Sequence, residues 1–324
     1  MPIFNAKELD FSGEKISMLL FGRAGIGKTT MAQSAPKPLL VDLERGIGRV
    51  ESIYRKDVMT TEKRLSDEET YHSFIYDLTH ENLSAYETII IDSVGKFMDL
   101  VTPVVIKENP ANGQKDGKTL SQKGYGAIAV KFRELTKLVT SLGKHIIWIA
   151  HVNEISDGDV IKVRINIPGG TKDKIWDDIN LGGYMTYLGK KRIINFTPTE
   201  QYDAKGAHGV VGSYEIPELK KKAEGGKDSD NHFLTDLFNL YISELNSDRI
   251  QMDQDKPIYE EAMKLVPKIE AVQNIDELNA VLEEIRNTKH ALTSKEELNS
   301  FFQVKVKELG ATYDKEAKRY IINA

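Results

Sequence analysis

The sequence contains no cysteine among its 324 residues, and it has no long apolar run. Disulfide bonds and zinc sites built on thiolates are therefore excluded, which suits an intracellular protein. No apolar run reaches the roughly 18 residues that a membrane-spanning helix needs, so we expect no membrane contact. The start of the chain, MPIFNAKELDFSGEK, lacks the basic and apolar regions of a secretory signal. The sequence therefore predicts a cytoplasmic protein.

An excess of positive charge is also missing, because the formal net charge is −5. A nucleic acid, if bound, must then be bound by local basic loops and not by the whole surface. With 40% hydrophobic and 29% charged residues, the composition is that of a globular protein with a well-solvated surface. The length suffices for one substantial domain and a smaller one.

A glycine-rich turn follows an apolar, strand-like run in LLFGRAGIGKTTMAQSA. Its spacing fits the phosphate-binding loop (P-loop) G-x-x-x-x-G-K-[ST], whose backbone N–H groups surround nucleotide phosphates. A glycine-rich turn that binds nothing is the alternative, but the strand pattern before the loop and the helix pattern after it favour a nucleotide site. The residues expected to contact the nucleotide are Gly22, Arg23, Ala24, Gly25, Ile26, Gly27, Lys28, Thr29 and Thr30.

Two side chains of the P-loop have separate chemical tasks. Lys28 is expected to bridge the β- and γ-phosphates and thus to act in catalysis, and the Thr29 hydroxyl is expected to bind Mg²⁺. The glycines let the backbone approach the phosphates closely. ATP and Mg²⁺ are therefore the expected cofactors.

Three further apolar runs lead into polar side chains: LLVDLERG into Glu44, TIIIDS into Asp92, and IIWIAH into His151. Strands alternate with helical patterns here, so we predict an α/β fold with a mostly parallel sheet flanked by helices. The carboxyl ends of parallel strands share one edge of the sheet. We therefore expect these three side chains to lie beside the P-loop.

Each of these side chains has a chemical task at a nucleotide site. Asp92 is the expected second ligand of Mg²⁺, and the alternative is a solvated residue at the start of a loop. Glu44 is the candidate that activates water for attack on the γ-phosphate, unless it is an ordinary surface residue. His151 could hydrogen-bond the γ-phosphate and report its presence, although a lone histidine at a strand end is often only structural.

The pattern changes beyond about residue 158, where short strands with turn residues predict an antiparallel extension of the sheet. The amphipathic stretch HFLTDLFNLYISEL is expected to form a helix that closes this domain. The C-terminal stretches PIYEEAMKLVPKIEAV, IDELNAVLEEIRN and TSKEELNSFFQVKVKELG predict helices. We therefore predict a P-loop domain over residues 1–247 and a small helical domain over residues 256–324.

The segments GRAGIGKTT, LLVDLERG, IIIDSVGKF and IIWIAH, in this order and spacing, resemble the core of RecA-type ATPases. They look most like the phage-encoded nucleotide-binding proteins of that superfamily, which include single-strand annealing and recombination ATPases. The resemblance covers roughly residues 15–200 and implies a RecA-like fold. It implies the roles given above for Lys28, Thr29, Glu44, Asp92 and His151.

In that family two loops face DNA, and they correspond here to residues 107–124 and 152–176. Lysines neutralise phosphates without reading sequence, and Trp176 could stack on a base, a combination suited to single-stranded DNA. Acidic residues are interleaved, so a solvated loop of mixed charge is the alternative. The basic residues placed in these loops are Lys107, Lys115, Lys118, Lys123, Lys162, Arg164, Lys172 and Lys174.

The resemblance also bears on assembly, and we expect a homo-oligomer. We identify neither an N-terminal polymerisation segment nor a counterpart of the C-terminal helices, so a filament is not implied. In a ring or filament, the basic turn formed by Lys190, Lys191 and Arg192 could reach the γ-phosphate of a neighbouring subunit. An ordinary basic turn is the alternative, which the sequence slightly favours.

The sequence thus predicts a Mg²⁺-dependent ATPase with slow turnover, stimulated by DNA or by a partner. Its nucleotide state would control single-stranded DNA binding in phage recombination, repair or replication, in the host-cell cytoplasm. A single-strand-binding or replication protein is an expected partner. The alternative is a nucleotide-switched loader or regulator that acts on a replication partner through its C-terminal helices. A small-molecule kinase is a third option, against which the lack of an arginine-rich lid counts.

Overall fold

The computed structural model describes residues 9–50, 56–60, 64–158, 160–167, 171–217 and 231–322. It divides into two compact units. The larger unit is Phe11–Leu245, and the smaller one combines Asn246–Ala324 with the N-terminal segment Met1–Asp10. The domain boundaries expected from the sequence stay a prediction.

In the described part of the larger unit, nine strands form one sheet in the order β3-β2-β4-β5-β1-β7-β8-β9, with β6 paired to β5. All neighbours from β3 to β7 run parallel, whereas β6, β8 and β9 pair antiparallel. The strands are β1 (Ser17–Gly22), β2 (Pro38–Asp42), β3 (Asp57–Thr60), β4 (Thr88–Asp92), β5 (His145–Asp157), β6 (Val160–Ile165), β7 (Leu181–Leu188), β8 (Lys191–Asn195) and β9 (Ser213–Glu215).

The central strands are buried on both sides because their side chains alternate between two cores. In β1, Leu19 and Phe21 belong to one core, and Met18 and Leu20 to the other. The α/β fold class with a mostly parallel sheet is confirmed. One detail differs from the expectation: β7 joins the parallel sheet beside β1, whereas β6, β8 and β9 form the antiparallel extension.

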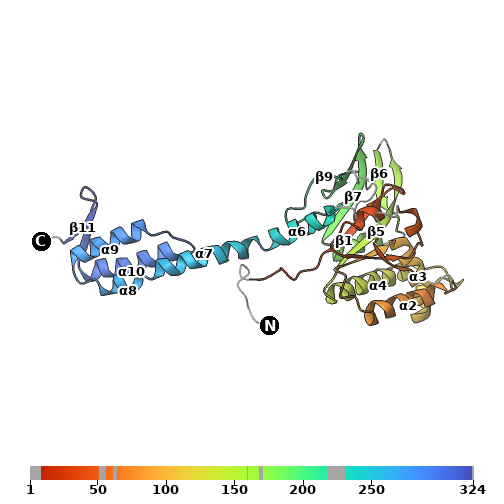
Figure 1. Cartoon of the computed structure of the whole chain (residues 1–324), viewed down its shortest axis with the longest axis horizontal. Coiled ribbons are helices and arrows are strands. Elements are labelled where there is room, and N and C mark those ends of the chain that lie inside the picture. The colour runs from red at the N-terminus through yellow and green to blue at the C-terminus, as the bar shows by residue number, and fades with distance from the viewer. Residues whose placement is uncertain are drawn as a thin grey trace, which may run out of the picture. The chain divides into compact units, whose positions relative to one another are not determined.

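Helices cover both faces of the sheet (Figure 1). One face packs against α2, α3 and α4, and there Trp148 lies between Phe97 and Phe132, with ring centroids 5.1 and 4.2 Å away. The other face packs against α1 and α6. The helices of this unit are α1 (Lys28–Ala32), α2 (Asp67–His80), α3 (Val94–Glu108), α4 (Gln122–Ser141), α5 (Thr171–Lys174) and α6 (Phe233–Leu245).

The smaller unit has its own apolar core, which includes Leu278, Leu298 and Phe302. The expectation of a single helix over PIYEEAMKLVPKIEAV is wrong, because the helix is interrupted near Leu265 and two helices form. The sequence patterns also missed a terminal hairpin. The elements are α7 (Ser247–Met263), α8 (Val266–Ala271), α9 (Ile275–Asn287), α10 (Ser294–Glu308), β10 (Ala311–Asp314) and β11 (Arg319–Ile322).

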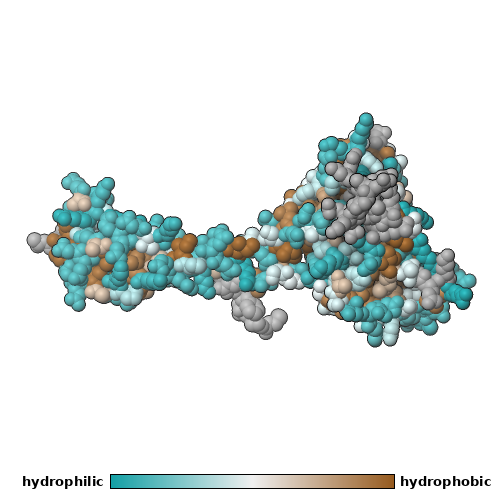
Figure 2. All heavy atoms as spheres, in the orientation of Figure 1, coloured by the Kyte–Doolittle hydropathy of each residue, from teal (hydrophilic) through white to brown (hydrophobic). Residues whose placement is uncertain are grey.

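The visible surfaces of both units are mainly hydrophilic, with hydrophobic residues in separate patches (Figure 2). None of the helices in the described ranges is long and apolar enough to cross a membrane.

Candidate nucleotide site

The P-loop connects β1 to α1 and takes backbone conformations that glycine permits. Gly25 and Gly27 have φ angles of 76° and 95°, in the left-handed region that side chains disfavour. At Gly22 a Cβ atom would lie 2.6 Å from the carbonyl oxygen of Met185 on β7. The loop therefore packs tightly against the sheet at the carboxyl ends of β1 and β7.

Lys28 lies at the first position of α1, and its ammonium group points back into the P-loop. Its Nζ donates hydrogen bonds to the carbonyl oxygens of Gly22 and Arg23, at 2.9 and 3.0 Å. Burial lowers the pKa of Lys28, and the carboxylates of Asp92 and Glu44 oppose that shift. A buried ammonium held by carbonyl dipoles is available to a phosphate that enters the loop.

The Thr29 hydroxyl donates a hydrogen bond of 2.7 Å to Oδ2 of Asp92 at the end of β4. Asp92 is only 7% exposed, and burial raises its pKa despite the hydrogen bond from Thr29. A hydroxyl and a carboxylate side by side are the hard oxygen ligands that Mg²⁺ accepts. The donor set therefore fits the metal expected at this position.

Glu44 lies two residues beyond β2, in a turn that a neighbouring carboxylate stabilises. Asp42 accepts hydrogen bonds of 2.8 Å from the backbone N–H groups of Gly46 and Ile47. The N–H of Glu44 donates to the carbonyl oxygen of Asp92, at 3.2 Å. These bonds hold the Glu44 backbone against the end of β4.

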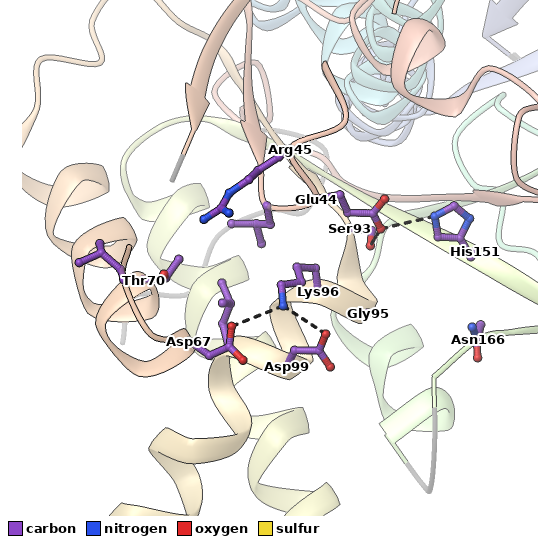
Figure 3. A pocket seen from close by; sticks show the side chains of 13 residues that line it. Glu44, Arg45, Asp67, Thr70, Ser93, Gly95, Lys96, Asp99, His151 and Asn166 are labelled. Carbon is purple, nitrogen blue, oxygen red and sulfur yellow. Dashed lines mark hydrogen bonds and ion pairs between the residues drawn. The ribbon is translucent and has the colours of Figure 1, made fainter. Parts of the chain in front are cut away.

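The Glu44 carboxylate is held by two side chains from neighbouring strands (Figure 3). The Ser93 hydroxyl donates a hydrogen bond to it, and Nε2 of His151 lies 3.5 Å from Oε1. The contact with His151, together with Ser93 and against partial burial, lowers the pKa of Glu44 to about 2. Nδ1 of His151 lies 3.4 Å from Nζ of Lys28. His151 therefore connects the Glu44 carboxylate with the P-loop lysine.

A pocket of about 600 Å³ opens beside this cluster and is lined by Glu44, Ser93 and His151. On its far side Lys96 forms ion pairs of 3.4 Å with both Asp67 and Asp99 (Figure 3). The pocket gives solvent or a ligand access to the Glu44 carboxylate.

The structure brings parts of the two basic loops together. The helix α5 packs against α4, and Nζ of Lys174 lies 4.0 Å from the place that a Cβ on Gly126 would take. Lys123 precedes Gly126 by about one turn of α4 and is exposed, as are Lys115 and Lys118. Basic groups of both loops therefore meet near the start of α4.

The remaining basic residues of the second loop differ in burial and in their hydrogen-bond partners. Lys162 is half-buried, and Arg164 donates hydrogen bonds to the carbonyl oxygens of Val163 and Gln201. The side chain of Lys172 lies outside the described part of the chain.

Two residues of the expected DNA loops are engaged elsewhere. Lys107 belongs to α3 and forms an ion pair of 2.6 Å with Glu68, so the first loop begins later than expected. Trp176 packs edge-on against Phe21, with ring centroids 5.7 Å apart. Trp176 is half-buried and its ring packs beside β1, a contact that does not favour stacking on a base, so that role stays a prediction.

Three cations of the basic turn before β8 were expected to reach a neighbouring subunit, but in the structure their side chains have different surroundings. Lys190 is exposed, and Lys191 forms an ion pair of 2.6 Å with Glu215. Arg192 instead reaches its own P-loop, where Nη1 donates to the carbonyl oxygen of Ile26 at 3.4 Å.

Sequence reasoning assigned no role to Ser93 or to Asn166, which also lines the pocket. Ser93 had a local signal, because a hydroxyl directly follows the candidate metal ligand. Asn166 had none, since its contacts with His151 and Asn153 arise from the pairing of β5 with β6.

The chain was compared with family models, curated proteins and solved structures. The curated proteins contain no match to the chain. Among the solved structures that match is "a prototypical ATPase from the type III secretion system of pathogenic bacteria", 14% identical, with a TM-score of 0.36. That match covers 54% of this chain, which spans about half (51%) of the other. Residues 14–208, more than half of the chain, match the family described as AAA domain (AAA_24). With the P-loop and the carboxylates at the strand ends, this match shows that the chain belongs to that AAA family of P-loop ATPase domains.

Proposed function

We propose that the protein is a Mg²⁺-dependent ATPase of RecA-like type whose nucleotide state controls binding to single-stranded DNA. The proposal places it with phage-encoded recombination and annealing ATPases, acting in recombination, repair or replication in the host-cell cytoplasm. The observation that carries the proposal is the position of His151, which contacts both the P-loop lysine and the candidate catalytic carboxylate.

The cluster around Glu44 suits hydrolysis by an activated water. With a pKa of about 2, Glu44 is ionised at neutral pH, so its carboxylate can accept a hydrogen bond from a water in the adjoining pocket. Ser93 and His151 fix the orientation of that carboxylate, which a positioned base requires. Lys28 and the P-loop N–H groups stabilise charge on the phosphates. Thr29 and Asp92 would hold Mg²⁺, which would neutralise part of that charge.

His151 also lies where it could transmit the nucleotide state. It is part of β5, which continues into the antiparallel hairpin with β6 that carries Lys162 and Arg164. A second link is the ion pair between Arg23 of the P-loop and Glu154 of β5. A phosphate that displaces Lys28 from its present contacts would therefore act on the hairpin through two connections.

The test is steady-state ATP hydrolysis without DNA, with single-stranded DNA and with duplex DNA, using Lys28→Ala as background. We expect Lys28-dependent turnover that rises with single strands more than with duplex. Turnover that persists in Lys28→Ala would contradict the assigned site. Turnover that depends on Lys28 but does not change with either DNA would contradict the proposal that the function is coupled to DNA.

A nucleotide-switched loader or regulator is the second candidate, and one observation favours it. The smaller unit has a core of its own and lies outside the family match, which ends at residue 208. Such a unit could dock a replication protein while the P-loop unit controls its release. Stimulation of hydrolysis by a partner protein and not by DNA would favour this candidate.

A further inference from the structure

Arg192 lies on the side of β1 that is away from the catalytic carboxylates. In the sheet order, the strands that lead to Glu44, Asp92 and His151 all lie on one side of β1. The strand of Arg192, β8, lies on the other side, separated from β1 by β7. Arg192 therefore approaches the P-loop from one side, and Glu44, Asp92 and His151 approach it from the other.

The strand register brings Arg192 to the height of the P-loop. Gly22 is paired with Met185 on β7, and Tyr187, two residues further on, is paired with Arg192. Arg192 precedes Ile194 by two residues, so it shares with Ile194 the sheet face on which α1 packs. The side chain can thus extend over that face toward the start of α1.

The guanidinium group contacts the P-loop at its last glycine. Besides the bond to the carbonyl oxygen of Ile26, Nη1 of Arg192 lies 2.8 Å from where a Cβ on Gly27 would be. Gly27 therefore serves two purposes, because it permits a φ of 95° and leaves room for the guanidinium.

The charge of Arg192 has no carboxylate counterpart within the described ranges. Its neighbour Lys191 is paired with Glu215, and Arg23 of the P-loop is paired with Glu154. A guanidinium has five N–H donors in a planar fork that fits phosphate oxygens. The single bond to Ile26 leaves donors of that fork available beside a loop built for phosphates.

We propose that Arg192 binds the α- or β-phosphate of the nucleotide in its own subunit. This inference rests on the proposed function, since it presumes a nucleotide whose γ-phosphate faces Glu44. With the γ-phosphate on that side of Lys28, the α- and β-phosphates would lie nearer to Gly27, which the Arg192 guanidinium contacts. Arg192 then contacts a group that ATP and ADP share, and it stabilises both bound states equally. A cation supplied to a neighbouring subunit would instead act on the γ-phosphate during hydrolysis.

The test measures dissociation constants of the full chain for ADP and for a non-hydrolysable ATP analogue. We expect Arg192→Gln to weaken binding of both by a similar factor of about 10 to 100, the effect of losing a charge-assisted hydrogen bond. The KM for ATP should rise by a factor similar to the loss of ADP affinity. Lys191→Gln, with its charge on the adjacent residue, is the matched control and should change neither constant.

Other results would overturn either the role of Arg192 or the proposed function. Unchanged affinities in Arg192→Gln, or a loss of turnover with unchanged affinities, would overturn the role of Arg192. No nucleotide binding by the unsubstituted protein would overturn the proposed function itself. If Arg192→Gln fails to fold, Arg192→Lys decides, because it keeps the charge and loses the planar fork. We expect an intermediate loss for both nucleotides in that variant, and unchanged affinities there would equally overturn the role.

Discussion

The carboxylate of Glu44 and the imidazole of His151 lie 3.5 Å apart although their residues are separated by more than one hundred positions in the chain. The contact forms because β4, the neighbour of both β2 and β5, ends at Asp92 and turns Ser93 toward the same point. The Glu44 carboxylate is thus oriented by Ser93, which follows β4, and by His151, which lies within β5.

Glu44→Gln should retain nucleotide binding and lose hydrolysis, because an amide of the same size cannot accept a proton from water. We expect turnover to fall about 10²- to 10⁴-fold, the usual contribution of a general base. The measurement combines steady-state hydrolysis with ADP affinity. Glu81→Gln, at an exposed glutamate after α2, should leave both unchanged. Normal turnover in Glu44→Gln would move the catalytic role to another residue.

Ser93→Ala should lower turnover, and it should also remove part of the stability that the ionised Glu44 carboxylate contributes. Ser93 is the N-cap residue of α3, but its hydroxyl makes no capping bond and donates to Glu44 instead. We expect a loss of about tenfold in turnover, with little change in KM, from the less restrained carboxylate. Steady-state kinetics and thermal unfolding measure the two effects.

Ser121→Ala is the matched control, since the Ser121 hydroxyl does cap α4 by accepting from the N–H of Gly124. It should lower the free energy of unfolding by about 1 kcal/mol and leave turnover unchanged. If Ser93→Ala loses stability in the same way and keeps its activity, the hydroxyl has a structural role only.

The parallel core and the P-loop were predictable because their signals are local. Continuous apolar runs such as TIIID mark strands buried on both faces, and polar residues at their ends fall on one edge of the sheet. The placement of Glu44 and Asp92 beside Lys28 followed from that rule, whereas His151, expected at a strand end, lies within β5, which continues to Asp157. Their assigned chemical roles stay predictions.

The side-chain contacts around the site were not predictable, because they depend on strand pairings that no local sequence pattern encodes. Trp176 reads as an exposed aromatic in a basic loop, yet its ring packs on Phe21 because Gly182 leaves space for it beside β7. Arg192 reads as part of a basic turn, and only the register of β7 with β1 and β8 brings it to Gly27. Side-chain partners across long sequence separations were therefore missed even where the strands themselves were expected.

The pKa of Glu44 predicts how stability depends on pH. Its folded value of about 2 lies below the ordinary value of 4.5, so the ionised form stabilises the fold. That contribution is fully present above pH 4.5 and is lost as the pH falls from 4.5 toward 2. The difference in unfolding free energy between the unsubstituted protein and Glu44→Gln should therefore shrink over this window. Urea titrations at several pH values measure it, and a difference that stays constant would show that the carboxylate is not held as described.

His151→Ala should uncouple the nucleotide state from DNA binding. The substitution removes the contacts of the imidazole with Lys28 and Glu44 at the base of the hairpin formed by β5 and β6. We expect the unsubstituted protein to bind single strands with different affinities in ATP and ADP, and the variant to bind them equally. His72→Ala, at an exposed position of α2, is the control. Equal affinities in the unsubstituted protein would remove the reason to call His151 a sensor.

Lys123 and Lys174, which the packing of α5 on α4 brings to one region, should contribute to DNA binding through phosphate charge. Each change to glutamine should lower affinity for single strands of any sequence. It should also lower the slope of log K against log salt by about 0.7, the value for one phosphate contact on a single strand. Lys107→Gln is the matched control, because Lys107 is already paired with Glu68 on α2 and should leave the slope unchanged. Since a general loss of fold would also weaken binding, the slope discriminates better than the affinity. Slopes that stay the same in both variants, with the protein folded, would place the DNA elsewhere and favour the loader or regulator.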